Sequence, residues 1–162
     1  MNPKLVIFNG HGTTTSIHGH KDNPIIVMND NEHLLKSRIT YAISCNVAAK
    51  LGKKIILNGN EGTAFIGYEG PFSFVRDASR ECTPMKDKFS EPFKRISNEV
   101  IISLLKGKSI KEAYEKSQQL CTKLIIEYSA SESEKSYKEI RFWLFWDKTF
   151  QKYLGDGNAA FI

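Results

Sequence analysis

Short apolar runs, separated by polar segments that often contain glycine, dominate the first half of the chain. Each run is short enough to be a strand that is buried on both faces of a sheet. The predicted strands are residues 5–9, 25–28, 39–44, 55–57 and 63–68. The pattern also predicts a helix from Asp30 through Leu35 and a second helix at residues 46–51 that Gly52 ends. We interpret residues 12–23, which are rich in Thr, Gly and His, as a loop, so this half has βα character.

The second half of the chain is predicted to be mainly helical, because its apolar residues recur at helical spacing. One helix is expected to begin at Glu91-Pro92 and to continue up to Gly107. Ser109 and Glu112 have the spacing of a capping box, which predicts that the next helix begins there. These helices are expected to flank the sheet.

Two further features are predicted near the end of the chain. A third helix is expected at residues 134–143, followed by two short strands within residues 144–154 around Asp147 and Lys148. Aromatic residues are dense at this point, and we interpret them as part of the core rather than as a platform for a ligand. They are Trp143, Phe145 and Trp146.

Length and composition indicate one globular domain over residues 1–162. Hydrophobic residues make up 41% of the chain and charged residues 25%, as in ordinary globular proteins that bury a core. The net charge of +5 is mild, and the basic residues of the predicted helices have glutamate neighbours. This pattern indicates solvated helix faces rather than a nucleic-acid-binding surface, so no nucleic-acid partner is expected.

The cysteines and the lengths of the apolar runs bear on the cellular setting. Cys45, Cys82 and Cys121 lack the short spacing of a metal site, and one is left over if two of them pair. A disulfide framework is therefore not expected, which favours a reducing compartment and a cytoplasmic location. No apolar run approaches the roughly 20 residues of a membrane span, so no membrane partner is expected. We interpret Cys82 and Cys121 as structural.

The most informative pattern is a histidine and a cysteine that each follow a predicted strand. The first strand runs into His11-Gly12, and the strand at residues 39–44 runs into Cys45. The carboxyl ends of parallel strands form the edge of an open sheet at which ligands bind. An imidazole can raise the thiolate fraction of a cysteine and later protonate a leaving amine. The backbone N–H groups of Gly12 and Cys45 are candidates for an oxyanion hole.

Short segments, in a fixed order, resemble those of a known family. They read NGHG at residues 9–12, AISC at residues 42–45 and GTAFIGY at residues 62–68. Together they resemble the caspase-like cysteine peptidases, a superfamily that includes caspases, gingipains, legumain, separase and the bacterial CHAT peptidases. The segment LGDGN at residues 154–158 is similar to the Gly-Asp segment that closes gingipain-like domains.

The resemblance implies an α/β domain of caspase-like topology, with a mostly parallel sheet flanked by helices. It also implies a cysteine endopeptidase that acts through an acyl-enzyme, with Cys45 as the nucleophile and His11 as the general base. This chemistry requires no metal or organic cofactor. The expected partner is a protein or peptide substrate.

In this superfamily, two strands with their helices normally precede the strand that carries the histidine. Here only residues 1–4 precede the first predicted strand. We therefore expect that the chain lacks the first strands of the fold. It is the C-terminal part of a longer domain, or a partner or upstream segment completes the sheet, or the sheet is truncated.

By analogy with related peptidases, the segment after residues 63–68 forms a wall of the pocket for the side chain that precedes the scissile bond. We expect Glu69, Phe72 and Asp77 to line this pocket. The two carboxylates could bind Arg or Lys through charge-assisted hydrogen bonds, which favours cleavage after a basic residue. Arg76 leaves open the opposite preference, for an acidic residue.

Three other functions stay open. The chain could be a non-catalytic interaction subunit of the same fold, in which His11 and Cys45 are remnants. It could be a metal-dependent hydrolase, because His11, His18 and His20 have an H-x6-H-x-H spacing that could ligate zinc, although the interpretation we favour contains no metal. A nucleic-acid binder is supported by the net charge alone.

Overall fold

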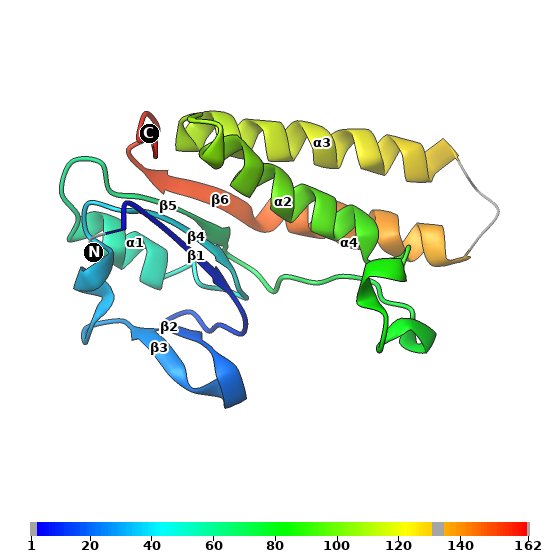
Figure 1. Cartoon of the computed structure of the whole chain (residues 1–162), viewed down its shortest axis with the longest axis horizontal. Helices are drawn as coiled ribbons and strands as arrows, with labels where there is room; N and C mark the ends of the chain where they lie inside the picture. Colours follow the sequence, from blue (N-terminus) through cyan, green and yellow to red (C-terminus); the bar gives the residue numbers. More distant parts are fainter. Residues whose placement is uncertain (1–2, 131–134, 162) are drawn as a thin grey trace.

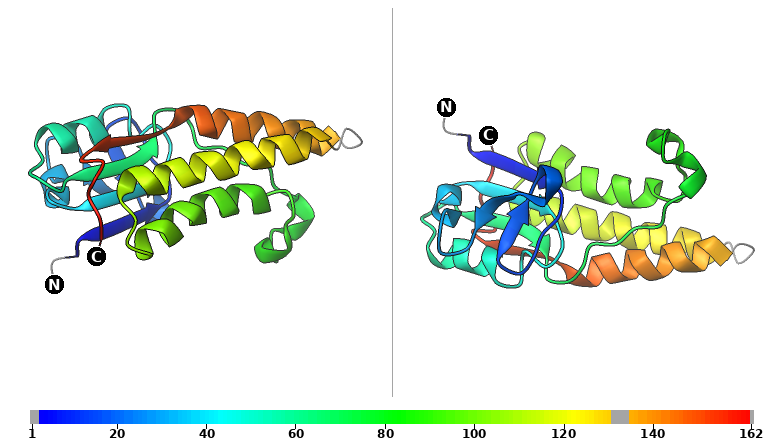
Figure 2. Two further views of the ribbon diagram at one scale, coloured as in Figure 1. Left: turned by 90° about the horizontal axis from the view of Figure 1, so that it is seen from above. Right: turned by 90° about the horizontal axis from the view of Figure 1, so that it is seen from below.

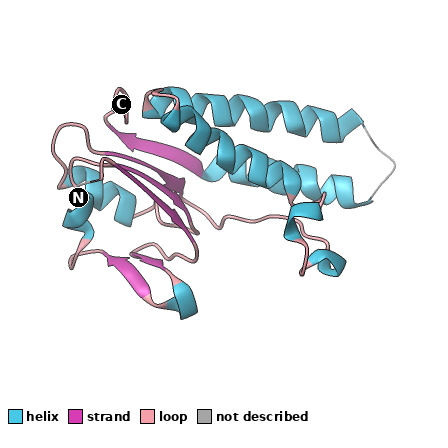
Figure 3. Ribbon diagram, viewed as in Figure 1, coloured by secondary structure: helices cyan, strands magenta, loops and turns pink. Residues whose placement is uncertain are grey.

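The computed structural model of the chain describes residues 3–130 and 135–161, which form an α/β structure with a four-stranded mixed sheet (Figure 1, Figure 3). Its strands, in spatial order, are β1 (Leu5–Asn9), β4 (Ile39–Ile43), β5 (Ala64–Tyr68) and β6 (Gln151–Gly155). β1, β4 and β5 are parallel, and β6 pairs with β5 in the antiparallel direction. The α/β class and the flanking helices are confirmed, whereas the caspase-like identity of the fold stays a prediction.

A two-stranded hairpin lies beside the main sheet (Figure 1) and includes a strand that the sequence pattern did not predict. It consists of β2 (Ser16–His18) and β3 (Pro24–Val27), which pair antiparallel around the 3₁₀ helix η1 (His20–Asp22). The interpretation of residues 12–23 as a loop is therefore wrong at β2. The polar residues around Ile17 concealed this strand, although the Ile17 side chain is buried in the core. The run at residues 25–28 does form a strand, but it pairs with β2 outside the main sheet.

Helix α1 (Leu51–Leu57) occupies positions where the sequence predicted a helix end and a strand. The predicted helix at residues 46–51 and the predicted strand at residues 55–57 are both wrong. Gly52 lies inside α1 and does not end a helix. A Cβ atom there would lie 2.9 Å from the Phe65 ring, so glycine allows α1 to pack closely on β5.

Three long helices form most of the second half of the chain. They are α2 (Glu91–Leu105), α3 (Ile110–Ala130) and α4 (Lys135–Phe150). α3 packs against both α2 and α4, and the three helices extend beyond the end of the sheet (Figure 2). The capping box is confirmed, because the Ser109 N–H and hydroxyl donate to Glu112 while the Glu112 N–H donates to Ser109 Oγ. The helix predicted from Asp30 through Leu35 is a short 3₁₀ helix, η2 (Glu32–Leu35).

The third long helix continues further than the sequence predicts. Its predicted first residue, Glu134, lies outside the described residues. Of the two short strands predicted within residues 144–154, the first is wrong, because α4 continues uninterrupted through Phe150, whereas the second is confirmed as β6. Ile140, Leu144 and Asp147 are buried at helical spacing along one face of α4. The dense aromatic residues around them concealed this periodicity.

The aromatic residues of α4 are more exposed than the sequence predicts. Phe145 is 62% exposed, and Trp143 and Trp146 are half-buried. The expectation that Phe145 is a core residue is wrong, because a helix turns neighbouring side chains to different faces. Cys121 is buried, in line with its structural interpretation, whereas Cys82 is exposed. Within the described residues, no helix has the length and apolar character needed to cross a bilayer.

Apolar side chains cover both faces of the main sheet. On β4, Tyr41 and Ile43 belong to the core cluster that α2 and α3 complete, and Ala42 belongs to the cluster that α1 completes. Burial on both faces explains why β4 and β5 read as continuous apolar runs in the sequence.

We expect the substitution Gly155→Ala to lower the free energy of unfolding by about 2 kcal/mol, because two penalties coincide at this position. The Gly155 backbone has a φ of +85°, and a Cβ atom there would collide with the Thr63 carbonyl oxygen. Urea unfolding would measure the loss. Gly157→Ala is the matched control, because no atom lies closer than 3.5 Å to its Cβ position. Equal losses in the two variants would contradict this explanation.

Candidate functional site

His11 and Cys45 follow two strands that leave the main sheet at the same edge. β1 and β4 are parallel neighbours with Asn9 opposite Ile43, and the Gly10 N–H donates to the Ile43 carbonyl oxygen at 3.3 Å. His11 and Cys45 lie just beyond these strand ends. The structure therefore places both residues at the carboxyl edge of the sheet, where open α/β sheets bind ligands.

Gly12 brings the two segments into direct contact. A Cβ atom at Gly12 would lie 2.8 Å from the Cys45 carbonyl oxygen. It would also lie 2.9 Å from the Ser44 Cβ atom and 2.6 Å from a methyl group of Val47. Because only the hydrogen of a glycine fits this space, the residue next to His11 lies against the backbone of Cys45.

Cys45 is a free cysteine with a partly exposed side chain. Its Sγ donates a hydrogen bond to the Phe72 carbonyl oxygen at 3.7 Å, so the thiol points toward the segment that follows β5. A thiol becomes a strong nucleophile when it loses its proton. His11 is exposed on the adjoining segment and supplies an imidazole at the same edge of the sheet.

The backbone groups predicted to form an oxyanion hole are available. Gly12 pairs with Ile17 in an isolated bridge, but the flanking residues make the hydrogen bonds of that bridge. Within the part of the chain that the structure describes, the N–H groups of Gly12 and Cys45 donate no hydrogen bond. Both groups can therefore donate to a negative charge that develops beside the thiol.

Of the predicted pocket residues, Phe72 lies beside the candidate thiol and Glu69 does not. The Phe72 carbonyl accepts from the Cys45 thiol. Glu69 instead forms an ion pair with Lys53, with 2.8 Å between its Oε1 and the Lys53 Nζ. The structure does not bring Glu69 together with Phe72 as the wall of one pocket.

Asp77 and Arg76 also have partners of their own. Asp77 Oδ1 accepts hydrogen bonds from the N–H and the hydroxyl of Ser79, which fix the turn that follows. Arg76 pairs with Glu81 at 3.1 Å. The two carboxylates that were expected to select a basic side chain are therefore separated, and each is engaged by a neighbour.

A cavity of about 290 Å³ lies beside Phe72 at the carboxyl edge of the sheet. Asn9 and Ile43, the last residues of β1 and β4, line it from the sheet. Phe74 lines it from the segment after β5, and Phe93 lines it from α2. The cavity thus lies between the strand ends that lead to His11 and Cys45 and the segment that the thiol contacts.

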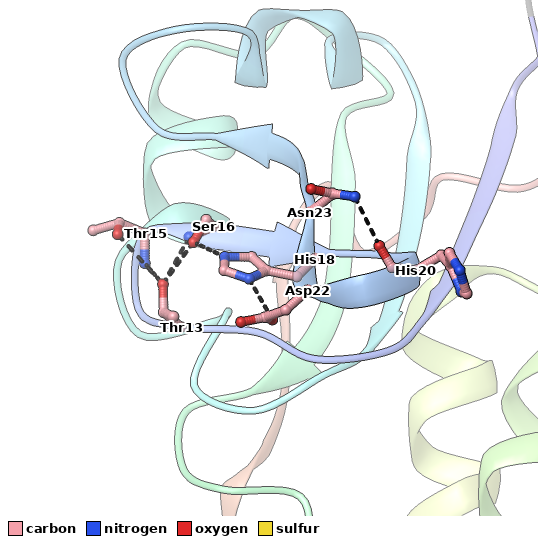
Figure 4. A network of polar contacts seen from close by, with 7 residues as sticks. All are labelled: Thr13, Thr15, Ser16, His18, His20, Asp22 and Asn23. Atoms are coloured by element: carbon pink, nitrogen blue, oxygen red, sulfur yellow. Dashed lines mark hydrogen bonds and ion pairs between the residues drawn. The ribbon is translucent and has the colours of Figure 1, made fainter.

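A chain of hydrogen bonds on the hairpin supports the loop that carries His11 (Figure 4). Asp22 Oδ1 bonds to His18 Nδ1 at 2.7 Å, and His18 Nε2 bonds to the Ser16 hydroxyl at 2.6 Å. The Ser16 hydroxyl bonds in turn to the Thr13 hydroxyl at 2.8 Å. The order Asp, His, Ser matches that of a serine hydrolase triad. Ser16 is only 8% exposed, however, so these bonds anchor Thr13 and the loop rather than present a nucleophile.

The predicted set of histidines does not form a metal site. Both ring nitrogens of His18 are engaged, and His20 points away from the His18 ring (Figure 4). In residues 3–130 and 135–161, no group of three or more His, Cys, Asp or Glu side chains could hold a metal ion. A metal-dependent hydrolase that uses His11, His18 and His20 therefore has no support in their arrangement.

Two residues of α4 that the sequence did not indicate as functional hold the backbone on either side of Phe72. Trp146 Nε1 donates to the Pro71 carbonyl oxygen at 2.9 Å, and the Ser73 N–H donates to Asp147 Oδ1 at 3.1 Å. These bonds join α4 to the segment whose carbonyl group contacts the Cys45 thiol. The prediction of strands within residues 144–154 concealed this role, because it separated the two residues from any helix face.

Asp147 is a buried acid with an altered proton affinity. Its side chain is 4% exposed, and its Oδ2 atom has no hydrogen-bond partner among the described residues. Burial raises the pKa of Asp147 to about 8, and the hydrogen bond from Ser73 opposes this change without cancelling it. The neutral form therefore predominates near neutral pH.

No protein-family model, curated protein or solved structure matches this chain.

Proposed function

We propose that this chain is a cysteine endopeptidase in which His11 and Cys45 form the catalytic dyad. The observation that carries this proposal is the contact between Gly12 and the Cys45 backbone. This contact joins a histidine-bearing segment to a free, partly exposed thiol at the carboxyl edge of two paired strands. The resemblance of residues 9–12 and 42–45 to caspase-like peptidases supports the same assignment.

In the proposed reaction, the His11 imidazole takes the proton of the Cys45 thiol, and the sulfur attacks the scissile carbonyl carbon. The N–H groups of Gly12 and Cys45 stabilise the negative charge on the carbonyl oxygen. The C–N bond then breaks, and the imidazolium gives its proton to the leaving amine. Water hydrolyses the resulting thioester with His11 again as the base, which regenerates the thiol.

Labelling with thiol-directed acyloxymethyl ketones that carry a peptide tests this proposal. We expect Cys45→Ala to abolish labelling and His11→Ala to lower its rate about 100-fold or more, because general-base assistance contributes at least that much. Intact-protein mass spectrometry would follow the covalent adduct. Cys82→Ala and His33→Ala are the matched controls, since both residues are exposed and lie outside the site. Labelling that survives His11→Ala at the wild-type rate would contradict the dyad.

A second candidate, a non-catalytic interaction subunit, has support from the position of β1. Among the described residues β1 pairs with β4 alone, and Ile7 on this edge strand is 39% exposed. Edge strands can add a strand from a partner or from another segment, through their unpaired N–H and C=O groups. This candidate predicts a well-folded chain whose labelling does not depend on His11.

A further inference from the structure

We propose that the cavity lined by Phe72, whose carbonyl group contacts the Cys45 thiol, binds a large aromatic side chain, in the substrate residue whose carbonyl carbon the thiol attacks. This inference rests on the proposed peptidase function and specifies its substrate class. It departs from the preference for Arg or Lys that the sequence favoured.

Phe72 links the cavity to the candidate nucleophile. Phe72 contacts the thiol and also lines the cavity. Its carbonyl oxygen lies 3.7 Å from the Cys45 Sγ. Ile43 lies two residues before the nucleophile and forms part of the same wall. In this proposal, the side chain of the residue being attacked extends past Phe72 into this cavity.

The wall of the cavity is suited to a planar, apolar group. The Phe72 and Phe74 ring centroids are 6.1 Å apart, and those of Phe74 and Phe93 are 6.5 Å apart, with both pairs tilted. Tilted rings at this spacing offer edges and faces to a further ring. The volume of about 290 Å³ is also sufficient, because a cavity of roughly 150 Å³ in a protein interior can bind benzene.

The charge around the cavity disfavours a basic side chain. Lys94 lines it, and the Lys94 Nζ donates to the Pro84 carbonyl oxygen at 2.7 Å, which holds the ammonium group in place. Among the described residues that line the cavity there is no Asp or Glu. Within the lining of the cavity, an Arg or Lys side chain would therefore meet a fixed like charge and no carboxylate.

The test compares acyloxymethyl ketones that differ only in the side chain next to the reactive group, which is that of Phe, Leu, Arg, Lys or Asp. We expect the Phe probe to label wild-type Cys45 at least about tenfold faster than the Arg and Lys probes, in line with the discrimination of apolar pockets. Equal rates for all probes, or a faster reaction with Arg, Lys or Asp, would overturn the inference while leaving the peptidase proposal intact.

One substitution should invert the preference. Phe74 lines the cavity but is 51% exposed, so Phe74→Glu adds a carboxylate to the wall without burying it in the core. We expect the Phe probe to become at least about tenfold slower and the Lys probe to become faster. Phe145→Glu is the matched control, because Phe145 is 62% exposed on α4 and does not line the cavity; both rates should stay unchanged.

If no probe reacts, the binding of small amino-acid amides to the Cys45→Ala protein tests the cavity separately from the peptidase reaction. N-acetyl-phenylalaninamide should shift the NMR signals of the Phe74 and Asn98 amides, which border the cavity, and N-acetyl-argininamide should not. Such shifts without labelling would support the aromatic selectivity of the cavity, but they would overturn the peptidase and with it the assignment of the cavity to the residue that the thiol attacks. The absence of both labelling and shifts would overturn the inference together with the proposed function.

Discussion

Replacing Asp147 with asparagine is expected to flatten the dependence of the free energy of unfolding on pH between about pH 5 and pH 8. In the wild-type protein, burial raises the pKa of Asp147 from 3.8 to about 8. The folded state therefore keeps a proton that the unfolded state releases throughout this range.

The direction of the effect follows from proton linkage. A group whose pKa is higher in the folded state than in the unfolded state contributes to the free energy of unfolding. This contribution is fully present below the unfolded-state pKa and is lost as the pH rises toward the folded-state pKa. Each pH unit within this window changes the free energy of unfolding by at most about 1.4 kcal/mol, which amounts to about 4 kcal/mol between pH 5 and pH 8. Asp147→Asn removes the titrating proton but keeps a side-chain oxygen that can accept from the Ser73 N–H.

Urea unfolding at a series of pH values would measure how steeply the free energy of unfolding changes with pH in the wild-type and Asp147→Asn proteins. The wild-type and Asp147→Asn proteins should differ least below about pH 4, and the variant should gain on the wild type with rising pH and be the more stable one at pH 8. The exposed Asp30→Asn is the matched control and should keep the wild-type slope. Parallel curves for the wild type and Asp147→Asn would contradict the assignment of this proton to Asp147.

Uncharged groups surround Asp147, which is why burial dominates its behaviour. Tyr41 from β4, Tyr68 from β5 and Cys121 from α3 interact with its charge, and burial also raises the pKa of Tyr41 and of Cys121 to about 12. A negative Asp147 thus has no cation to balance it among these neighbours. Above its pKa, Asp147 carries a negative charge that these neighbours do not balance, which destabilises the fold around α4. Asp147 also accepts from the Ser73 N–H, the contact that positions the Phe72 segment.

Local patterns predicted the parts of the site that depend on adjacent residues. His11 and Cys45 follow apolar runs short enough to be strands, and parallel pairing of β1 and β4 brings their ends to one edge. The capping box at Ser109 is equally local, since its bonds join residues three apart in the sequence. Such features can be predicted because each is encoded within a few neighbouring positions.

The wall of the cavity could not be predicted in the same way. The bond between Ser73 and Asp147 joins residues 74 positions apart, and Phe93 reaches the cavity from a helix that begins well after β5. The charged residues Glu69 and Asp77 looked suitable for binding a cation because they are close in sequence. Their side chains find other partners, and no local signal indicated those partners.

Gly12→Ala is expected to slow the labelling of Cys45 about 100-fold, because small displacements of catalytic groups have effects of this size. The Gly12 backbone does not need a positive φ, so the effect comes from crowding alone. The new methyl group would lie 2.8 Å from the Cys45 carbonyl oxygen and 2.6 Å from a Val47 methyl group. The two segments must separate to make room, which moves His11 and the Gly12 N–H away from the thiol.

Two measurements distinguish this displacement from general unfolding. Urea unfolding should show a loss of about 1–3 kcal/mol, as is usual for overpacking, while the circular dichroism spectrum stays that of the wild type. Iodoacetamide, which reacts with an accessible thiolate and uses neither the cavity nor the oxyanion hole, should still alkylate Cys45 in the folded variant, whereas the peptide-bearing probe should react about 100-fold more slowly. Gly157→Ala, whose Cβ atom would make only ordinary van der Waals contacts, should leave both reactions unchanged. If Gly12→Ala reacts with the peptide-bearing probe at the wild-type rate, the contact between the two segments does not position the dyad, and the main support for the peptidase is lost.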